Sequence, residues 1–530
     1  MCQKFVTTSD SVDLDRAIEL TGYGRFHYEI LAVSALSIVS MGFQNGLSSY
    51  VFPAAQCDLN LTSYELGILN MAFMIGGIAS CFLWGALADN FGRKNILILA
   101  HFIDATVTLV CSVLPGSFVL LVCRFLNGFI VGAPGSIIFT YVAEFQPPKY
   151  KTPMVCCCGV FFTLSWLLLP LMAYFILPIQ GINFNIANTF IMVPWRFFLI
   201  ILTLPEFLVT IWLLKTPETP KFHFAKGNHR ECLEVLKTMY SRNTGNHPEN
   251  YPVRKLATDM KMEIQNDVVC EGKSQRILRN MVKQIKSLFV SPLLKVTFLT
   301  CFIMFGNMFG MFGLGLWLPE IFVRFDQFEK LYPNATPSIK ELSQLTNEKN
   351  ISCESTFDST VTFNTVVIGS TSLFINIICS LLATKLHFKI IPLTAMLVGG
   401  VSSGIFYFLT SSMQNLVVAS IFQAGMIIAN MTIGSIAVEL YPTSVVGIGL
   451  SLIMFSGRLG AMTSSYLFGY FMDTRCEIPI FVVAFVVLLG GVVGFFVPRQ
   501  SEYAKRRKIS TASSGIEVAV LSHNGEIKFR

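Results

Sequence analysis

The chain has little charge. Of its 530 residues, 13% are Asp, Glu, Lys or Arg, against roughly 25% in soluble domains, whereas 53% are hydrophobic. A soluble fold of this length could not cover its surface with so few charges. The basic residues do not form a patch on a polar domain, which argues against a nucleic-acid partner. The lipid bilayer is therefore the expected solvent for much of the chain.

The sequence also lacks the patterns of an enzyme or a metalloprotein. The 14 cysteines are scattered, mostly within apolar stretches, with no CxxC pair and no His/Cys metal-ligand spacing. No nucleophile stands with a recognisable base. We expect no enzyme activity, no metal and no cofactor. Residues 1–24 are polar and acidic rather than a signal peptide, so the first apolar stretch serves as an uncleaved signal anchor.

Long apolar stretches are the main feature of the sequence. A hydropathy window of about 19 residues finds twelve candidate membrane helices, each long enough to cross about 30 Å of hydrocarbon. Helices are required because backbone groups in lipid must bond within their own segment. The expected spans are 27–50, 64–87, 95–115, 118–143, 154–178, 195–214, 293–318, 362–384, 390–411, 414–438, 445–470 and 478–497.

Basic residues set the expected orientation. Most of the 39 Lys and Arg residues lie on one alternate set of loops, which places both termini in the cytoplasm. Few fall in the outer loops: Arg324, Lys330, Lys340, Lys349 and Arg475. The glycosylation acceptors of the N-x-S/T type lie on the same outer side: Asn60, Asn334 and Asn350.

A long polar segment divides the twelve spans into six and six. The expected organisation is a tail at 1–25, a six-helix half at 26–214, a cytoplasmic connector with amphipathic helices at 215–292, a second half at 293–497 with an outer loop at 319–361, and a tail at 498–530. The two halves also end corresponding helices alike, with YVAEFQPP and IAVELYPT. Repeated halves are the usual build of secondary transporters.

One loop carries a full signature. After the second apolar stretch the chain reads Gly85-Ala-Leu-Ala-Asp89-Asn-Phe-Gly92-Arg93-Lys94. Gly85 lets another helix approach closely, and Gly92 permits a tight turn. Asp89 can cap a helix N-terminus, and Arg93 can pair with a carboxylate. The pattern resembles the loop 2–3 signature of the major facilitator superfamily, G-x-x-x-D-x-x-G-R-[RK], at every defined position.

Other segments narrow the resemblance. The stripe Arg124-x-x-x-Gly128-x-x-x-Gly132 is followed by Glu144-x-x-Pro147-x-x-x-Lys151, which is similar to the sugar-porter-like E-x-x-P-x-x-x-R. Glu439-Leu-Tyr-Pro-Thr443 and Gly457-Arg458-Leu-Gly460 look like the synaptic vesicle glycoprotein 2 and organic ion transporter group. This resemblance implies an all-α, multi-pass major facilitator fold whose cytoplasmic gate is tied by Asp89, Arg93, Glu144 and Glu439. The sequence departs where the family often has acidic residues, at Met41 and Gln44.

Ionisable residues inside the expected spans are the main candidates for function, because their insertion costs roughly 2.5–3.5 kcal/mol each. Arg458 is the first of them: it either grips a carboxylate or phosphate of the solute or pairs with an internal acid. Arg124 is expected to pair within the N-terminal half. Asp104 and Glu206 are candidate partners of it and candidate proton carriers.

Polar and aromatic residues complete the expected cavity, although amides can equally bond another helix. The candidate set is Gln44, Asn45, Phe162, Trp166, Asn307, Phe312, Gln423, Asn430 and Arg458. In the tail, Ser510 follows a basic cluster that attracts anionic lipid and is a candidate phosphorylation site.

Two functions follow as hypotheses. The first is a monomeric transporter of a small organic solute, anionic or zwitterionic if Arg458 is free, with sugars or cations open if it is neutralised. The second is a non-transporting regulatory or binding protein of a vesicle membrane, with vesicle-protein partners. Either would lie in the plasma membrane or in a synaptic or secretory vesicle membrane.

Overall fold

The structure is a computed structural model. It describes residues 12–59, 61–114, 116–179, 184–186, 190–257, 273–291, 293–331, 359–382, 390–441 and 445–498. The expected glycosylation acceptors Asn60, Asn334 and Asn350 and the candidate Ser510 lie outside these residues.

The N-terminal half contains the first six expected spans as helices. Two of the spans are divided: α2 is followed directly by α3, and α4 meets α5 at a bend of 48°. The helices are α2 (Arg25–Gly46), α3 (Ser48–Leu59), α4 (Ser63–Ser80), α5 (Leu83–Phe91), α6 (Arg93–Val113), α7 (Ser117–Phe145), α8 (Pro148–Ile176) and α9 (Pro194–Leu214). A short antiparallel hairpin, β1 (Phe184–Ile186) with β2 (Phe190–Met192), joins α8 to α9.

The C-terminal half contains the other six spans. Its first span is longer than expected, because α14 (Leu293–Phe312) is followed by α15 (Leu314–Leu331), which continues past residue 318. The remaining helices are α17 (Ser359–Leu382), α18 (Ile390–Ile405) with the short η2 (Phe406–Phe408), α19 (Ser412–Leu440), α20 (Val446–Phe471) and α21 (Glu477–Gly494). The twelve-span, two-half fold expected from the sequence is therefore confirmed.

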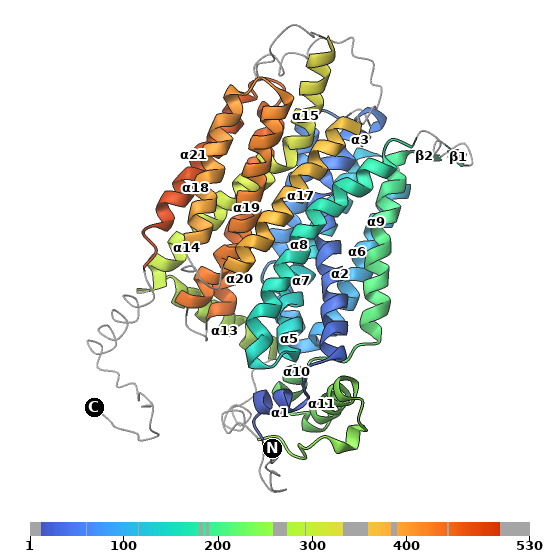
Figure 1. The fold of residues 1–530 in the computed structure, drawn as a ribbon, viewed down its shortest axis with the longest axis vertical. Coiled ribbons are helices and arrows are strands. Elements are labelled where there is room, and N and C mark those ends of the chain that lie inside the picture. The colour runs from blue at the N-terminus through green and yellow to red at the C-terminus, as the bar shows by residue number, and fades with distance from the viewer. Residues whose placement is uncertain are drawn as a thin grey trace.

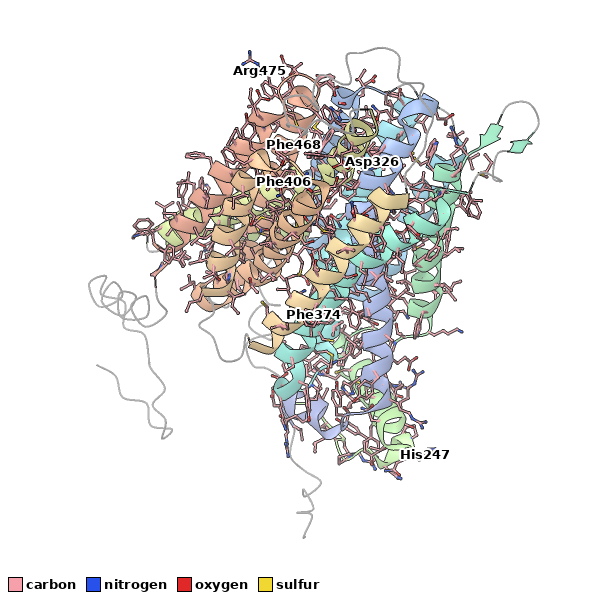
Figure 2. All side chains as sticks on the ribbon, turned by 45° about the horizontal axis from the view of Figure 1, so that its top comes forward. His247, Asp326, Phe374, Phe406, Phe468 and Arg475 are labelled. Atoms are coloured by element: carbon pink, nitrogen blue, oxygen red, sulfur yellow. The ribbon has the colours of Figure 1, made fainter. Side chains whose placement is uncertain are left out.

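The polar segments gather at one end of the bundle, which we call the connector end. There lie α1 (Leu14–Leu20), α10 (Pro220–Ala225), α11 (His229–Thr244), η1 (Pro248–Asn250) and α13 (Lys273–Leu288), while the hairpin and the outer part of α15 lie at the far end (Figure 1). Figure 2 places His247 and Arg475 at these opposite ends. A parallel bridge joins Val12 to Leu256, and Tyr251 donates to the Ala17 carbonyl at 2.6 Å, so the N-terminal segment packs on the connector.

The two halves meet along α4 and α20, which run antiparallel. Gly67 faces Gly469 near the far end, and a Cβ on Gly67 would come 2.8 Å from the Gly469 Cα. Towards the connector end, the Cys81 thiol donates to the Ser451 carbonyl at 3.2 Å. On the other side of the bundle α8 packs against α17. The interface between the halves thus depends on close backbone approach at glycines.

Candidate functional site

The signature loop forms a tight turn at the connector end. Gly92 has φ +96°, which an L side chain rarely adopts, and its α carbon lies against the Glu218 carboxylate. Glu218 accepts the Lys94 backbone N–H at 3.0 Å at the first turn of α6. The helix-capping role expected of Asp89 belongs instead to Glu218, which comes from the segment after α9. The turn expected at Gly92 is present.

Arg93 pairs with two carboxylates of unequal exposure. Its Nη2 lies 2.9 Å from Glu144 at the end of α7 and 3.4 Å from Asp89. Asp89 is 71% exposed, whereas Glu144 is 13% exposed. The carboxylate partner expected for Arg93 is thus chiefly Glu144. Lys94 Nζ reaches the Leu214 carbonyl at 3.4 Å.

Two further residues expected to act with this turn are Gly85 and Glu439. No atom of the described residues lies within 4 Å of a Cβ built on Gly85, so no other helix approaches it closely in this conformation. Glu439 lies in α19, but its side chain is outside the described part of the chain.

A cluster of buried polar side chains fills the interior of the N-terminal half. Asn127 donates to Asp104 at 2.6 Å and to Thr108 at 3.0 Å. Gln44 donates to Thr108 at 2.9 Å and to Glu206 at 3.2 Å. The Asp104 and Glu206 carboxyl groups lie within hydrogen-bonding reach of each other. Gln44, expected in the cavity, is therefore part of this network, and the two candidate coupling acids are brought together.

Arg124 closes the same cluster from α7. Its Nη2 donates to the Gln44 carbonyl at 3.3 Å and to Ser48 Oγ at 3.0 Å. The guanidinium lies 4.3 Å from the centroid of the Phe73 ring, a cation–π distance. Arg124 is buried and close enough to Asp104 to interact electrostatically, so its expected partner within the N-terminal half is present. Asn45 instead donates to the Met41 carbonyl of its own helix at 2.8 Å.

Arg458 lies between the halves. It is half-buried near the middle of α20, and its guanidinium packs directly on Gly77 of α4, where any Cβ would overlap it. Within the described residues Arg458 makes no hydrogen bond and no ion pair. The Cys81 thiol lies close enough to interact with the guanidinium electrostatically. The guanidinium therefore faces the other half of the protein and not the acyl chains, and it lacks an internal acid there.

Several of the remaining expected cavity residues have buried polar atoms without partners. Among the described side chains, no hydrogen bond reaches Asn307 Oδ1, Gln423 Oε1 or Trp166 Nε1. Trp317 Nε1, from α15, shares this property. Such atoms are costly unless water or a ligand bonds them. Asn307 also donates to the Met426 carbonyl at 3.0 Å.

The other expected wall residues are buried among apolar groups. Asn430 contacts the Met311 sulfur at 3.2 Å, and Phe162 and Phe312 are buried. All three residues are buried inside the halves, and no ion pair involves them in the described structure.

Sequence reasoning missed an ion cluster at the far end. Arg324 of α15 lies 2.9 Å from Glu320 and 2.8 Å from Asp473, and it also donates to Ser63 at 3.2 Å. Ser63 donates to Asp473 at 2.8 Å. Because Ser63 belongs to the N-terminal half, the cluster ties the two halves together. The i,i+4 spacing of Glu320 and Arg324 was the available signal, and it was hidden by placing Arg324 in a loop.

Comparisons with known proteins agree with this architecture. The sequence profile described as Major Facilitator Superfamily matches residues 34–333. The chain is 27% identical to synaptic vesicle glycoprotein 2B of Homo sapiens over 58% of this chain and 47% of the relative. It is 26% identical to synaptic vesicle glycoprotein 2C of Mus musculus over 57% of this chain and 44% of the relative. It thus spans about half the length of the curated relatives it matches.

Solved structures show the same fold at low identity. The partially occluded inward-open conformation of the xylose transporter XylE from E. coli matches with a TM-score of 0.63 and 15% identity, covering 90% of this chain and 100% of that one. A crystal structure of a D-xylose–proton symporter matches with a TM-score of 0.62 and 14% identity, covering 90% of this chain and 99% of that one.

Proposed function

Because the chain belongs to the major facilitator superfamily, a family of membrane transporters that are generally not enzymes, we propose that it carries a small organic solute across a membrane by alternating access. The two halves would tilt against each other along α4 and α20 and expose the site between them to each side in turn. The connector end would face the cytoplasm, as the basic loops favour.

The observation that carries this proposal is that Arg458 has no ion-pair partner among the described residues. A guanidinium buried in a membrane protein without a counter-ion is costly, and such residues commonly mark substrate pathways. A planar guanidinium binds carboxylate or phosphate through two parallel hydrogen bonds. Arg458 would therefore bind an anionic or zwitterionic solute. The partnerless atoms of Asn307, Gln423 and Trp166 would supply neutral hydrogen bonds to its uncharged part.

Opposite ends of the bundle would provide the two gates. The Arg93–Glu144 pair belongs to the connector end, where Glu439 of the other half would complete the contact. The cluster around Arg324 belongs to the far end. Alternating access requires that one gate be broken while the other is made.

Flux measurements test the solute site. Purified full-length protein in liposomes would be offered a panel of labelled organic anions and zwitterions, with neutral sugars and organic cations beside them. We expect uptake of an anion or zwitterion, and Arg458→Ala should reduce it at least tenfold while leaving protein yield unchanged. Arg475→Ala, a far-end arginine outside the site, is the matched control. Equal uptake by the Arg458→Ala variant and the original protein would contradict the assignment.

A second function has its own support. Curated relatives carry the name synaptic vesicle glycoprotein 2, and Met41 and Gln44 replace acids common in helix 1 of the family. The protein would then be a regulatory or binding protein of a vesicle membrane that keeps the fold without net transport. Specific binding of a vesicle protein, together with no flux of any solute in the panel, would support this alternative.

A further inference from the structure

The carboxyl pair of the N-terminal half has one oxygen that no donor reaches. Asp104 and Glu206 are both buried, at 3% and 1% exposure, and lie within hydrogen-bonding reach of each other. Asn127 donates to Asp104, and Gln44 donates to one oxygen of Glu206. Glu206 Oε2 has no hydrogen-bond partner among the described residues. A hydrogen bond between two carboxyl groups requires that one of them hold a proton.

Counting charges supports one shared proton. The charged or titratable groups brought to this pair are Arg124 from α7 and His101 from α6, with Cys111 and Cys123 beside Arg124. Arg196, on α9 with Glu206, points instead to the Ser112 carbonyl at 3.3 Å. With neutral thiols and a neutral imidazole, Arg124 balances one negative charge. While the pair is buried in this conformation, the second carboxyl group is then neutral, because two like charges in contact are costly in a buried site.

A column of hydroxyl groups leads from the pair towards the connector end. Ser34, Ser37 and Ser40 recur every three residues on the buried face of α2. Ser40 faces Glu206, and Ser37 hydrogen-bonds His101 Nε2 at 2.7 Å. Ser34 Oγ has no hydrogen-bond partner among the described residues, and Ser40 Oγ has none there besides its approach to Glu206. Buried hydroxyls without partners are sites for ordered water, which carries protons between fixed groups.

We propose that the Asp104–Glu206 pair is a proton-binding site and that Ser40, Ser37 and His101 connect it to the connector end. The proton binds the pair, converting one carboxylate to a carboxylic acid, and leaves along the same column. This proposal deepens the proposed transport function by naming the coupling ion as H⁺. The pair would bind the proton from α6 and α9, in a chain that has Met41 and Gln44 on α2 where family members often have acids.

Infrared spectroscopy tests the site without any solute. Full-length protein in lipid nanodiscs would be titrated with pH while the carbonyl stretch of protonated carboxyl groups is followed and assigned by its shift in D₂O. We expect a protonated carboxyl band at neutral pH that is lost in Glu206→Gln and lost or shifted in Asp104→Asn. Glu65→Gln is the matched control, because this exposed capping carboxylate lies outside the site. A band unchanged in both Glu206→Gln and Asp104→Asn would overturn the proposal.

The rate at which the carboxyl band responds to pH tests the proposed proton path through Ser37 and His101. After a pH jump, the band of the Ser37→Ala and His101→Gln variants should respond several-fold more slowly than that of the original protein, with the same final amplitude. Equal rates in both variants would remove Ser37 and His101 from the path. Because these readouts need no solute, their outcome is separate from that of the flux experiment: a proton site without flux would leave the proton-binding site standing and remove the transport function together with the coupling role of the proton.

Discussion

Arg93 shows how exposure decides the value of an ion pair. Its contact with Glu144 is short and mostly shielded, whereas its contact with Asp89 is long and reaches an exposed carboxylate. Exposed pairs contribute about 0–1 kcal/mol, whereas removing one member of a shielded pair leaves the other charge uncompensated. The sequence signature contains Asp89 and not Glu144, yet the structure gives the stronger contact to Glu144.

Substitution of the two carboxylates should therefore have unequal effects. We expect Glu144→Gln to lower the free energy of unfolding by about 1–2 kcal/mol, and Asp89→Asn by less than about 0.5 kcal/mol. Thermal unfolding of detergent-solubilised protein, followed by size-exclusion chromatography, measures both. If Asp89→Asn proved the more destabilising of the two, the ranking drawn from exposure would be wrong.

Cys232 of α11 provides a prediction about pH. Burial raises the pKa of its thiol to about 12, and the thiol donates to the Pro220 carbonyl at 3.3 Å. The unfolded thiol ionises near its ordinary pKa of about 8.5 while the folded one stays neutral. The stabilising contribution is therefore complete below about pH 8.5 and falls as the pH rises from there towards 12.

Alkylation tests the burial of Cys232 on which this pH dependence rests. At pH 8 we expect maleimide to leave Cys232 unmodified in the folded protein and to modify it fully after denaturation in SDS, as read by peptide mass mapping. Rapid modification of Cys232 in the folded protein would show that α11 does not hold it buried.

The membrane-spanning helices could be predicted because composition determines them, whereas their ends and their contacts could not. The apolar stretches fixed twelve spans because lipid permits no other backbone arrangement. The end of α15 was not predictable in this way, because Glu320 and Arg324 are polar and look like a loop until Asp473 and Ser63 are seen beside them. The same limit applied to Glu218, whose capping of α6 depends on a contact 124 residues away along the chain.

Gly67 of α4 and Gly85 of α5 should therefore respond differently to the same substitution. At Gly67 a Cβ would meet the backbone of Gly469, which cannot rotate away, so Gly67→Ala should destabilise the protein by about 1–3 kcal/mol. At Gly85 nothing lies within 4 Å, so Gly85→Ala should be neutral or stabilise by up to about 1 kcal/mol, because alanine favours a helix. Thermal unfolding compares the two variants. A large loss of stability in Gly85→Ala would contradict the open space seen there.

At the scale of the whole molecule, the sequence predicted the two halves but not the conformation in which they meet. The signature loop and the basic residues identify one end of the bundle, and the two ion pairs of Arg93 there, with Glu144 and with Asp89, stay within the N-terminal half. At the far end Arg324 joins the C-terminal half to Ser63 of the N-terminal half. Which gate is closed is a property of contacts between distant segments, so no local pattern could reveal it.

The Arg324 cluster should therefore hold the far end closed. Arg324→Gln would leave Glu320 and Asp473 without their shared cation and would shift the population towards a state open at that end. The measurement is the rate at which a maleimide that cannot cross the membrane labels Ser465→Cys, which is buried on α20. We expect Arg324→Gln to raise this rate several-fold and the exposed control Arg475→Gln to leave it unchanged. Equal rates in the two variants would mean that close glycine packing along α4 and α20, and not the ion cluster, keeps the far end closed.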